Sequence, residues 1–158
     1  MANIRAARNL HLIDIENLTG TPRPTQADVV NARLAYEPLI AAGDHVVLAC
    51  NHGAFLVVEQ AWPGVRHIAR SGPDGADEAL LDVVRHERAA DRFTAVWMAT
   101  GDGGFAETAA QLCSDGVTVT VVVGRGRLSN RLRLATMHLA YLDLDLLPTE
   151  SARIRWTA

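Results

Sequence analysis

Three aspartates stand in sequence surroundings that suit a metal-binding site. Asp14 ends the short apolar run Leu10–Asp14, Asp77 opens a helical pattern, and Asp102 lies within Gly101–Gly104. Carboxylate oxygens are the ligands that hard divalent cations such as Mg²⁺ and Mn²⁺ prefer. Two carboxylates about 4 Å apart repel by roughly 4 kcal/mol at an effective dielectric of 20, and a bound cation removes that penalty. If the three aspartates meet in space, the sequence predicts a Mg²⁺ or Mn²⁺ site.

Each of these aspartates also has an ordinary structural explanation when it is taken alone. Asp77 could be a first-turn residue that the helix dipole favours. Asp102 could be a turn residue, and Asp14 could cap the end of a strand. The metal-site interpretation therefore depends on a fold that brings the three segments together.

The elements that must position these residues alternate along the chain. Short runs rich in β-branched residues predict strands, and longer runs with helical periodicity predict helices. The alternation predicts a three-layer α/β/α sandwich with a mostly parallel central sheet. Ligands bind such sheets outside the carboxyl ends of the strands, where the three aspartates are expected. The expected strands are 10–14, 45–50, 66–69, 93–100, 117–123 and 138–142, and the expected helices are about 25–42, 54–62, 77–89, 105–114 and 128–136.

The length of 158 residues fits one domain, which we place at residues 1–147. Residues 148–158 form a C-terminal tail in this interpretation, and Arg153–Thr157 alternates like an edge strand. That strand could close the sheet or pair with another subunit, so a homodimer is one expectation for the tail.

Composition narrows the function classes. The net charge of −3 argues against a protein that coats nucleic acid by bulk charge. All 15 basic residues are arginines, whose planar guanidinium groups suit phosphate. The chain shows neither a signal peptide nor the roughly 20 apolar residues of a membrane span, so we expect a cytoplasmic protein with no membrane partner. Its two cysteines belong to no zinc-ligand pattern.

Three segments together resemble NYN domains, a branch of the PIN-like nucleases. Leu12–Leu18 resembles the opening motif of that family, and Gly75–Leu80 is similar to the start of its central acidic helix. Ala99–Phe105 resembles its Ser-Gly-Asp-x-Asp-Phe loop. The resemblance runs from about residue 9 to residue 142. The family's closing section resembles a strand and two further positions: Gly116–Gly124, Ser129 and Leu132.

The resemblance implies a PIN-like sandwich and a divalent-metal-dependent ribonuclease that hydrolyses RNA phosphodiester bonds by means of a metal-activated water. Asp14, Asp77 and Asp102 fall on the family's metal-binding acids, and Asn17 and Thr100 fall on its polar supporting positions. Mg²⁺ or Mn²⁺ is the implied cofactor. The implied partner is RNA, either single-stranded or structured.

One position departs from the family pattern. The second acid of the family's Asp-x-Asp loop is replaced by Gly104, which puts two-metal binding and catalysis in question. Glu78, Glu16 or Glu107 could supply the missing carboxylate, with Glu78 as a further metal ligand. Asp82 lies more than one helical turn beyond Asp77 and is a weaker candidate.

Four arginines between residues 125 and 133 form a basic segment beside the acids. We expect Arg125, Arg127, Ser129 and Arg131 to bind the RNA backbone independently of sequence. Glycines at 124 and 126 would leave backbone amides open for phosphate at the start of a helix. The alternative for this segment is a solvated basic loop.

Two other functions remain open. A catalytically weak NYN-like module could bind RNA or act as a regulatory partner, because of the missing acid at Gly104. An aspartate-dependent phosphatase is ranked lowest, because Asp14-Ile15-Glu16 is not a DxD pair. A Cys50/His52 nucleophile is conceivable, but a core cysteine followed by a helix cap is the preferred interpretation.

Overall fold

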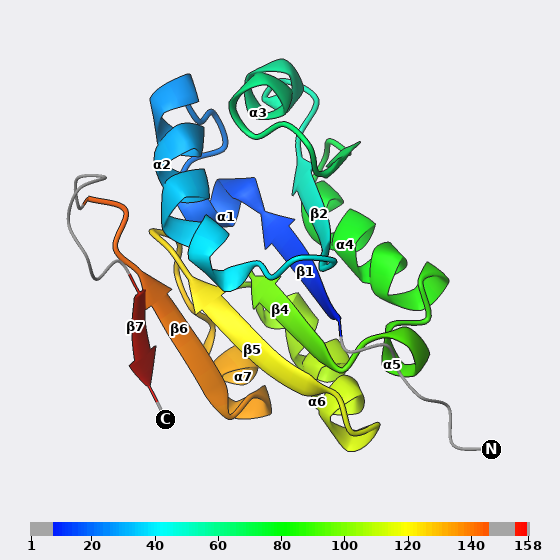
Figure 1. Ribbon diagram of the computed structural model, residues 1–158. Coiled ribbons are helices and arrows are strands. Elements are labelled where there is room, and N and C mark those ends of the chain that lie inside the picture. The colour runs from blue at the N-terminus through cyan, green and yellow to red at the C-terminus, as the bar shows by residue number, and fades with distance from the viewer. Residues whose placement is uncertain (1–7, 146–153, 158) are drawn as a thin grey trace.

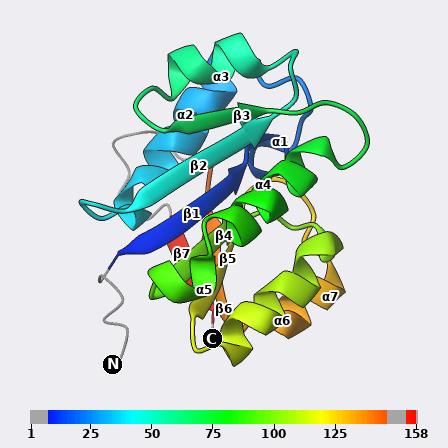
Figure 2. The same cartoon turned by 90° about the vertical axis from the view of Figure 1, so that its right-hand side faces the viewer.

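The computed structural model describes residues 8–145 and 154–157. Its centre is a seven-stranded sheet in the order β3-β2-β1-β4-β5-β6-β7, in which all neighbouring strands are parallel except β6 and β7 (Figure 1). Helices cover both faces, so the predicted three-layer α/β/α sandwich is confirmed (Figure 2). The strands are β1 (Asn9–Asp14), β2 (His45–Cys50), β3 (Arg66–Ala69), β4 (Ala95–Ala99), β5 (Thr118–Val123), β6 (His138–Leu142) and β7 (Ile154–Thr157).

The helices divide into two layers. α1 to α3 pack on one face of the sheet and α4 to α7 on the other, because the connection from β3 to β4 crosses to the opposite side. The α-helices are α1 (Ile15–Thr19), α2 (Gln26–Tyr36), α3 (Phe55–Ala61), α4 (Gly75–His86), α5 (Ala89–Arg92), α6 (Ala106–Ser114) and α7 (Asn130–Ala135). Two short 3-10 helices are η1 (Glu37–Leu39) and η2 (Gly103–Phe105).

Strand β1 shows why the central strands are apolar along their whole length. Leu10 and Leu12 pack into the core under α4 and α6, whereas Ile13 packs into the core under α1 to α3. Successive side chains of a strand point to opposite faces, so a strand covered on both sides must be apolar at nearly every position. Asp14 has the parity of Leu10 and Leu12, so its side chain points to the side of the sheet that carries α4.

A buried polar network fixes the start of β1. The Asp44 carboxylate, with a side chain 2% exposed, accepts hydrogen bonds from Asn9 N (2.9 Å) and Ala41 N (2.9 Å). It also lies 3.0 Å from Nε2 of His11, whose Nδ1 lies 2.9 Å from the Tyr36 hydroxyl. His11 therefore has a structural role.

Several boundaries differ from the predicted ones, and helix α5 was not expected. Helix α1 was not expected, and the predicted helix to residue 42 ends at Tyr36 before η1. Helix α4 ends at His86 rather than Ala89, because Arg88 adopts a left-handed backbone with φ 50°. Strand β4 is shorter at both ends than the predicted 93–100.

The tail contributes strand β7, which pairs antiparallel with β6 of the same chain. Trp156 on β7 makes an edge-on contact with Trp97, with ring centroids 5.8 Å apart. The proposed boundary at residue 148 lies outside the described residues. Within the described ranges, no helix has the length and apolarity needed to cross a bilayer.

Candidate metal centre

The acidic residues lie where the strand order of the sheet reverses. β1 has β2 on one side and β4 on the other, and Ile13 of β1 pairs with Ala99 of β4. Chain segments leave such neighbouring strands toward opposite faces, which opens a crevice at their carboxyl ends. Asp14 is the last residue of β1, and Thr100 follows the last residue of β4.

Asp14 caps helix α1. Its Oδ1 accepts hydrogen bonds from the backbone N–H groups of Glu16 (3.1 Å) and Asn17 (3.2 Å). The residue is 7% exposed, and burial raises the pKa of its carboxyl group despite these two bonds. Asp14 therefore does cap the helix, as its ordinary structural explanation required. Its carboxyl group also interacts electrostatically with that of Asp77.

Helix α4 supplies two aspartates from its N-terminal end. Asp74 is its N-cap residue and adopts a left-handed backbone with φ 57°, yet its carboxylate caps no backbone N–H. Gly75 follows, where a Cβ atom would lie 2.8 Å from the Arg70 carbonyl oxygen, so the tight approach of the preceding loop requires glycine. Asp77 lies in the first turn of the helix. This local backbone leaves both carboxyl groups available for other partners.

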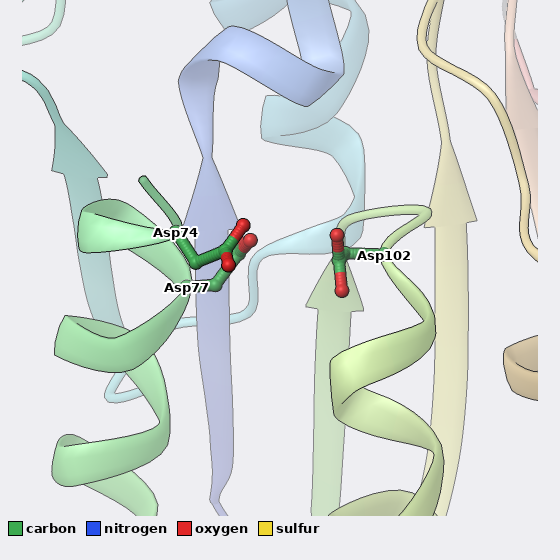
Figure 3. Close-up of side chains that lie close together, drawn as sticks. All are labelled: Asp74, Asp77 and Asp102. Carbon is green, nitrogen blue, oxygen red and sulfur yellow. The ribbon is translucent and has the colours of Figure 1, made fainter. Parts of the chain in front are cut away.

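The structure brings three aspartates together at this edge. Asp74, Asp77 and Asp102 each offer one carboxylate oxygen, and these oxygens lie within 4.8 Å of one another. Figure 3 shows Asp74 and Asp77 side by side at the start of α4, facing the loop after β4 that carries Asp102. Oxygens on opposite sides of one Mg²⁺ ion are about 4.2 Å apart, twice the bond length of about 2.1 Å. The spacing is therefore close to that of a shared ion.

The electrostatics of Asp77 fit a cation site. Burial, together with the neighbouring charges of Asp14 and Asp102, raises its pKa to about 8. Its Oδ1 is buried and has no hydrogen-bond partner among the described residues. A buried carboxylate oxygen without a donor, facing other carboxylates, is an environment in which a divalent ion can take the place of a proton.

The loop after β4 holds Asp102 in place. The backbone N–H of Asp102 donates to Thr100 Oγ1 (3.2 Å), and Asp102 Oδ1 accepts from the backbone N–H of Gly104 (2.6 Å). Thr100 is buried and supports the loop rather than facing solvent. A Cβ atom at Gly104 would lie 2.9 Å from Asp102 Oδ1, so any side chain at this position would press on that carboxylate.

The basic loop after β5 packs tightly against α1. The backbone N–H of Arg125 donates to Leu18 O (3.0 Å), and that of Gly126 donates to Asn17 O (2.9 Å). A Cβ atom at Gly124 would lie 2.2 Å from Leu18 O, so this approach requires glycine. The prediction that the glycine amides are open for phosphate is wrong for Gly126, whose N–H bonds a carbonyl group of α1.

Ser129 is also used structurally. Its backbone N–H donates to Gly101 O (2.8 Å), and its Oγ accepts from Arg131 N (3.2 Å) at the start of α7. A Cβ atom at Gly101 would lie 1.7 Å from the Arg127 carbonyl oxygen. The basic loop and the Asp102 loop are therefore in direct contact, so the arginines border the acidic edge.

The arginine side chains differ in what they contact. Arg125 forms ion pairs with Asp28 (3.8 Å) and Asp145, which offset its charge. Arg127 and Arg131 are exposed, and no carboxylate within 8–145 or 154–157 pairs with either. Those two guanidinium groups are thus available to an anionic ligand, as is that of Arg133, which is exposed and also forms no ion pair among the described residues.

Asn17 lies between the acids and the basic loop. Its backbone N–H bonds Asp14, while its side-chain Oδ1 is buried without a hydrogen-bond partner among the described residues. Asn17 Oδ1 would lie 2.7 Å from a Cβ atom at Gly126. This orientation places the amide against the loop, next to the acids that it was expected to support.

The other acids considered from the sequence lie apart from this group. Glu78 is exposed and belongs to no metal-ligand group found among the described residues. Glu16 accepts hydrogen bonds from Asn51 N (2.9 Å) and Asn51 Nδ2 (2.7 Å) through one oxygen. Asp82 forms ion pairs with two arginines, and Glu107 is exposed on α6.

Asp74 is the residue that sequence reasoning missed. The segment Ser71–Gly75 is typical of a turn, and an aspartate in a turn needs no further explanation. Its carboxylate reaches the other two only because the residue adopts a left-handed backbone at the start of α4. The Asp-Gly pair at the start of a helix was the available signal, since both residues tolerate that conformation.

Comparison with known proteins adds no family assignment. No protein-family model matches this sequence, and no curated protein is significantly similar to it. The NYN resemblance therefore stays a prediction from three sequence motifs, and the function must be argued from the geometry of the aspartates and their neighbours.

Proposed function

We propose that this protein is a divalent-metal-dependent ribonuclease of the NYN and PIN-like type, in which Asp74, Asp77 and Asp102 hold Mg²⁺ or Mn²⁺. The observation that carries the proposal is the convergence of their carboxylate oxygens within 4.8 Å of one another. The unpartnered Oδ1 of Asp77 and the pKa of about 8 for that carboxyl group support it.

Each residue at this edge has a definable task. Asp77 gives up its proton before it can act as a ligand, because ligating carboxylates must be ionised. Asp14 is held by α1 and adds negative charge beside Asp77. Thr100 fixes the loop that presents Asp102. A bound divalent ion would lower the pKa of a water molecule and offset charge on the phosphoryl oxygens of a phosphodiester.

The basic loop supports a nucleic acid strand as the proposed substrate class. Arg127 and Arg131 are exposed beside the Asp102 loop, where they can contact phosphate groups of a nucleic acid strand. Contacts to phosphate position a strand without reading its sequence. We therefore propose sequence-independent binding of the RNA backbone at this edge.

A specific observation favours a second candidate function. Because residue 104 is glycine, no carboxylate stands at this position, and a Cβ atom there would crowd Asp102. A site short of one acid could bind metal and RNA without turnover. The alternative is therefore a catalytically weak RNA-binding or regulatory module on the same fold.

Cleavage of labelled single-stranded RNA in Mn²⁺ tests the proposal. Wild-type protein is expected to cleave, and Asp77→Asn and Asp102→Asn are each expected to lose at least about 100-fold in rate, the scale of a lost transition-state electrostatic contact. Asp91→Asn is the matched control, because Asp91 is an exposed acid that pairs with Arg88. Unchanged cleavage in both site variants would refute the assignment.

Calorimetric titration with Mn²⁺, paired with an RNA gel shift, separates the two candidates. The ribonuclease proposal expects metal binding, RNA binding and turnover in the same preparation. Binding of metal and RNA without turnover under any divalent ion would favour the regulatory module instead.

A further inference from the structure

A histidine and a serine form a pair just beyond the carboxyl ends of β2 and β3. His52 Nδ1 lies 2.8 Å from Ser71 Oγ, and the backbone N–H of His52 donates to the same oxygen at 3.0 Å. The strands beneath are paired up to Cys50 and Ala69. The pair therefore joins two loops that leave the sheet at neighbouring positions.

Hydrogen bonds connect the loop after β2 to Asp14, and the loop after β3 continues along the chain to Asp74. Asn51 donates its backbone and side-chain N–H groups to Glu16, and the backbone N–H of Glu16 donates to Asp14. Ser71 stands three residues before Asp74 in the loop that leads into α4. Because β2 is the hydrogen-bonded neighbour of β1, about 4.8 Å away, His52 follows a strand end adjacent to that of Asp14, on the side of β1 opposite the strands that lead to the arginines.

The pairing orients the imidazole ring. With Nδ1 bound to Ser71, the other ring nitrogen, Nε2, is directed away from the serine and has no hydrogen-bond partner within the described ranges. His52 is exposed, and none of the described carboxylates forms an ion pair with it. Histidine is the side chain suited to exchanging a proton near neutral pH.

Phosphodiester hydrolysis also needs a proton donor for the leaving group. When the bond from phosphorus to the leaving ribose oxygen breaks, its electron pair stays on that oxygen, which then requires a proton to leave as a hydroxyl group. Aspartates that hold a cation are ionised and carry no proton to give. A positioned proton donor contributes about 10²- to 10⁴-fold in rate.

We propose that His52 donates the Nε2 proton to the leaving oxygen during phosphodiester hydrolysis, and that Ser71 is the positioning residue that orients its ring. This inference rests on the proposed ribonuclease function. The attacking water forms the new bond to phosphorus and loses a proton to solvent. The leaving oxygen keeps the electron pair of the broken bond and takes the histidine proton, and the neutral imidazole regains a proton from solvent.

Two substrates with different leaving groups test this role. In RNA the leaving group is a ribose oxygen, which needs a proton to depart as an alcohol. A nucleotide p-nitrophenyl phosphodiester instead releases nitrophenolate, which needs no proton. His52→Gln is expected to slow RNA cleavage about 10²-fold or more and to leave cleavage of the nitrophenyl ester unchanged. Ser71→Ala is expected to give a smaller loss that is likewise confined to RNA. His86→Gln, at an exposed histidine in the last turn of α4, is the matched control.

The outcomes separate this role from the proposed function. If wild-type protein cleaves both substrates and His52→Gln cleaves both as fast, or slows both equally, the role of His52 is refuted while the ribonuclease stands. If wild-type protein cleaves neither substrate, the ribonuclease proposal and this inference fail together. Mn²⁺ affinity, measured for each variant, must match that of the wild type, because His52 is assigned to the proton and not to the metal.

Discussion

Asp77 carries a carboxyl group whose surroundings oppose ionisation. Burial and the charges of Asp14 and Asp102 raise its pKa to about 8, and its Oδ1 is buried without a partner among the described residues. The folded chain consequently holds a proton there at neutral pH when no cation is present. In the proposed function, a cation that displaced this proton would relieve the same repulsion, so proton and metal would compete for one place.

This competition predicts a pH-dependent stability in metal-free buffer. Because the pKa is raised from 3.8 to about 8, the folded chain binds more protons than the unfolded chain between these values, and the free energy of unfolding falls as pH rises through that window. Asp77→Asn removes this slope, since asparagine resembles the protonated acid. Urea unfolding in EDTA across the window should show the variant gaining on the wild type as pH rises, and parallel profiles would contradict the pKa argument.

Asp74 should contribute directly to metal affinity. Asp74→Asn removes one of the three convergent carboxylates, and we expect a loss of at least about 10-fold in Mn²⁺ affinity, as is seen even for weaker supporting contacts. Glu78→Gln is the matched control, because Glu78 is an exposed acid in the same helical turn. Equal affinity of the Asp74 variant and the wild type in calorimetry would remove Asp74 from the site.

Sequence reasoning identified Asp77 and Asp102 because the neighbouring residues predict a helix start at Asp77 and a strand end before Asp102. It missed Asp74, since the direction of a turn side chain depends on its backbone conformation, and φ 57° at a non-glycine residue is not written in the residue type. It also gave Asp14 a place among the ligands, whereas the structure shows one of its oxygens capping α1.

At the level of elements, two loops and helix α1 meet through glycines. The loop after β5 lies against both α1 and the loop after β4, and Gly101 and Gly124 each stand where a Cβ atom would overlap a carbonyl oxygen. These contacts hold Asp102 and the arginines in one arrangement. Rigid loop packing is what a preorganised site requires.

Gly101→Ala should therefore destabilise the protein and disturb the site. A Cβ atom there would lie 1.7 Å from Arg127 O, and such overpacking costs about 1–3 kcal/mol. Gly53→Ala is a milder comparison, with its nearest atom, Asn51 Oδ1, at 3.1 Å. Thermal unfolding should show the larger loss at Gly101, and a Gly101 variant as stable as the wild type would mean that the loops are not held this way.

Element types were largely predictable, but element ends were not. Periodicity and β-branched runs located six strands and five helices, since burial on both faces of a sheet leaves a strong apolar pattern. Helix α1 has only five residues and buries Ile15, Leu18 and Thr19, too short a pattern to recognise. The end of α4 depends on the backbone of Arg88, which tertiary packing decides.

At the scale of the whole molecule, charge is divided along one edge of the sheet. The net charge is −3, yet Arg127 and Arg131 are exposed beside the three aspartates. In the proposed function, such a division would let an acidic centre that binds a cation approach a polyanion bound by the arginines. The fold class followed from the alternation of elements, whereas the kind of ligand rests on where the loops place these charges.

The salt dependence of RNA affinity should accordingly reflect the number of arginines that contact phosphate. Each phosphate contact contributes about 0.7 to the slope of log affinity against log salt for a single strand, so Arg127→Ala and Arg131→Ala should each lower the slope by about that amount. Arg88→Ala, an exposed arginine paired with Asp91, should leave it unchanged. Equal slopes for all three variants would show that RNA binds elsewhere.

Anomalous diffraction from crystals soaked in Mn²⁺ tests the central claim most directly. We expect one peak within bonding distance, about 2.1 Å, of carboxylate oxygens from Asp74, Asp77 and Asp102, and its loss in Asp77→Asn crystals. The absence of any peak at these aspartates, with manganese bound at another place on the protein, would contradict the account.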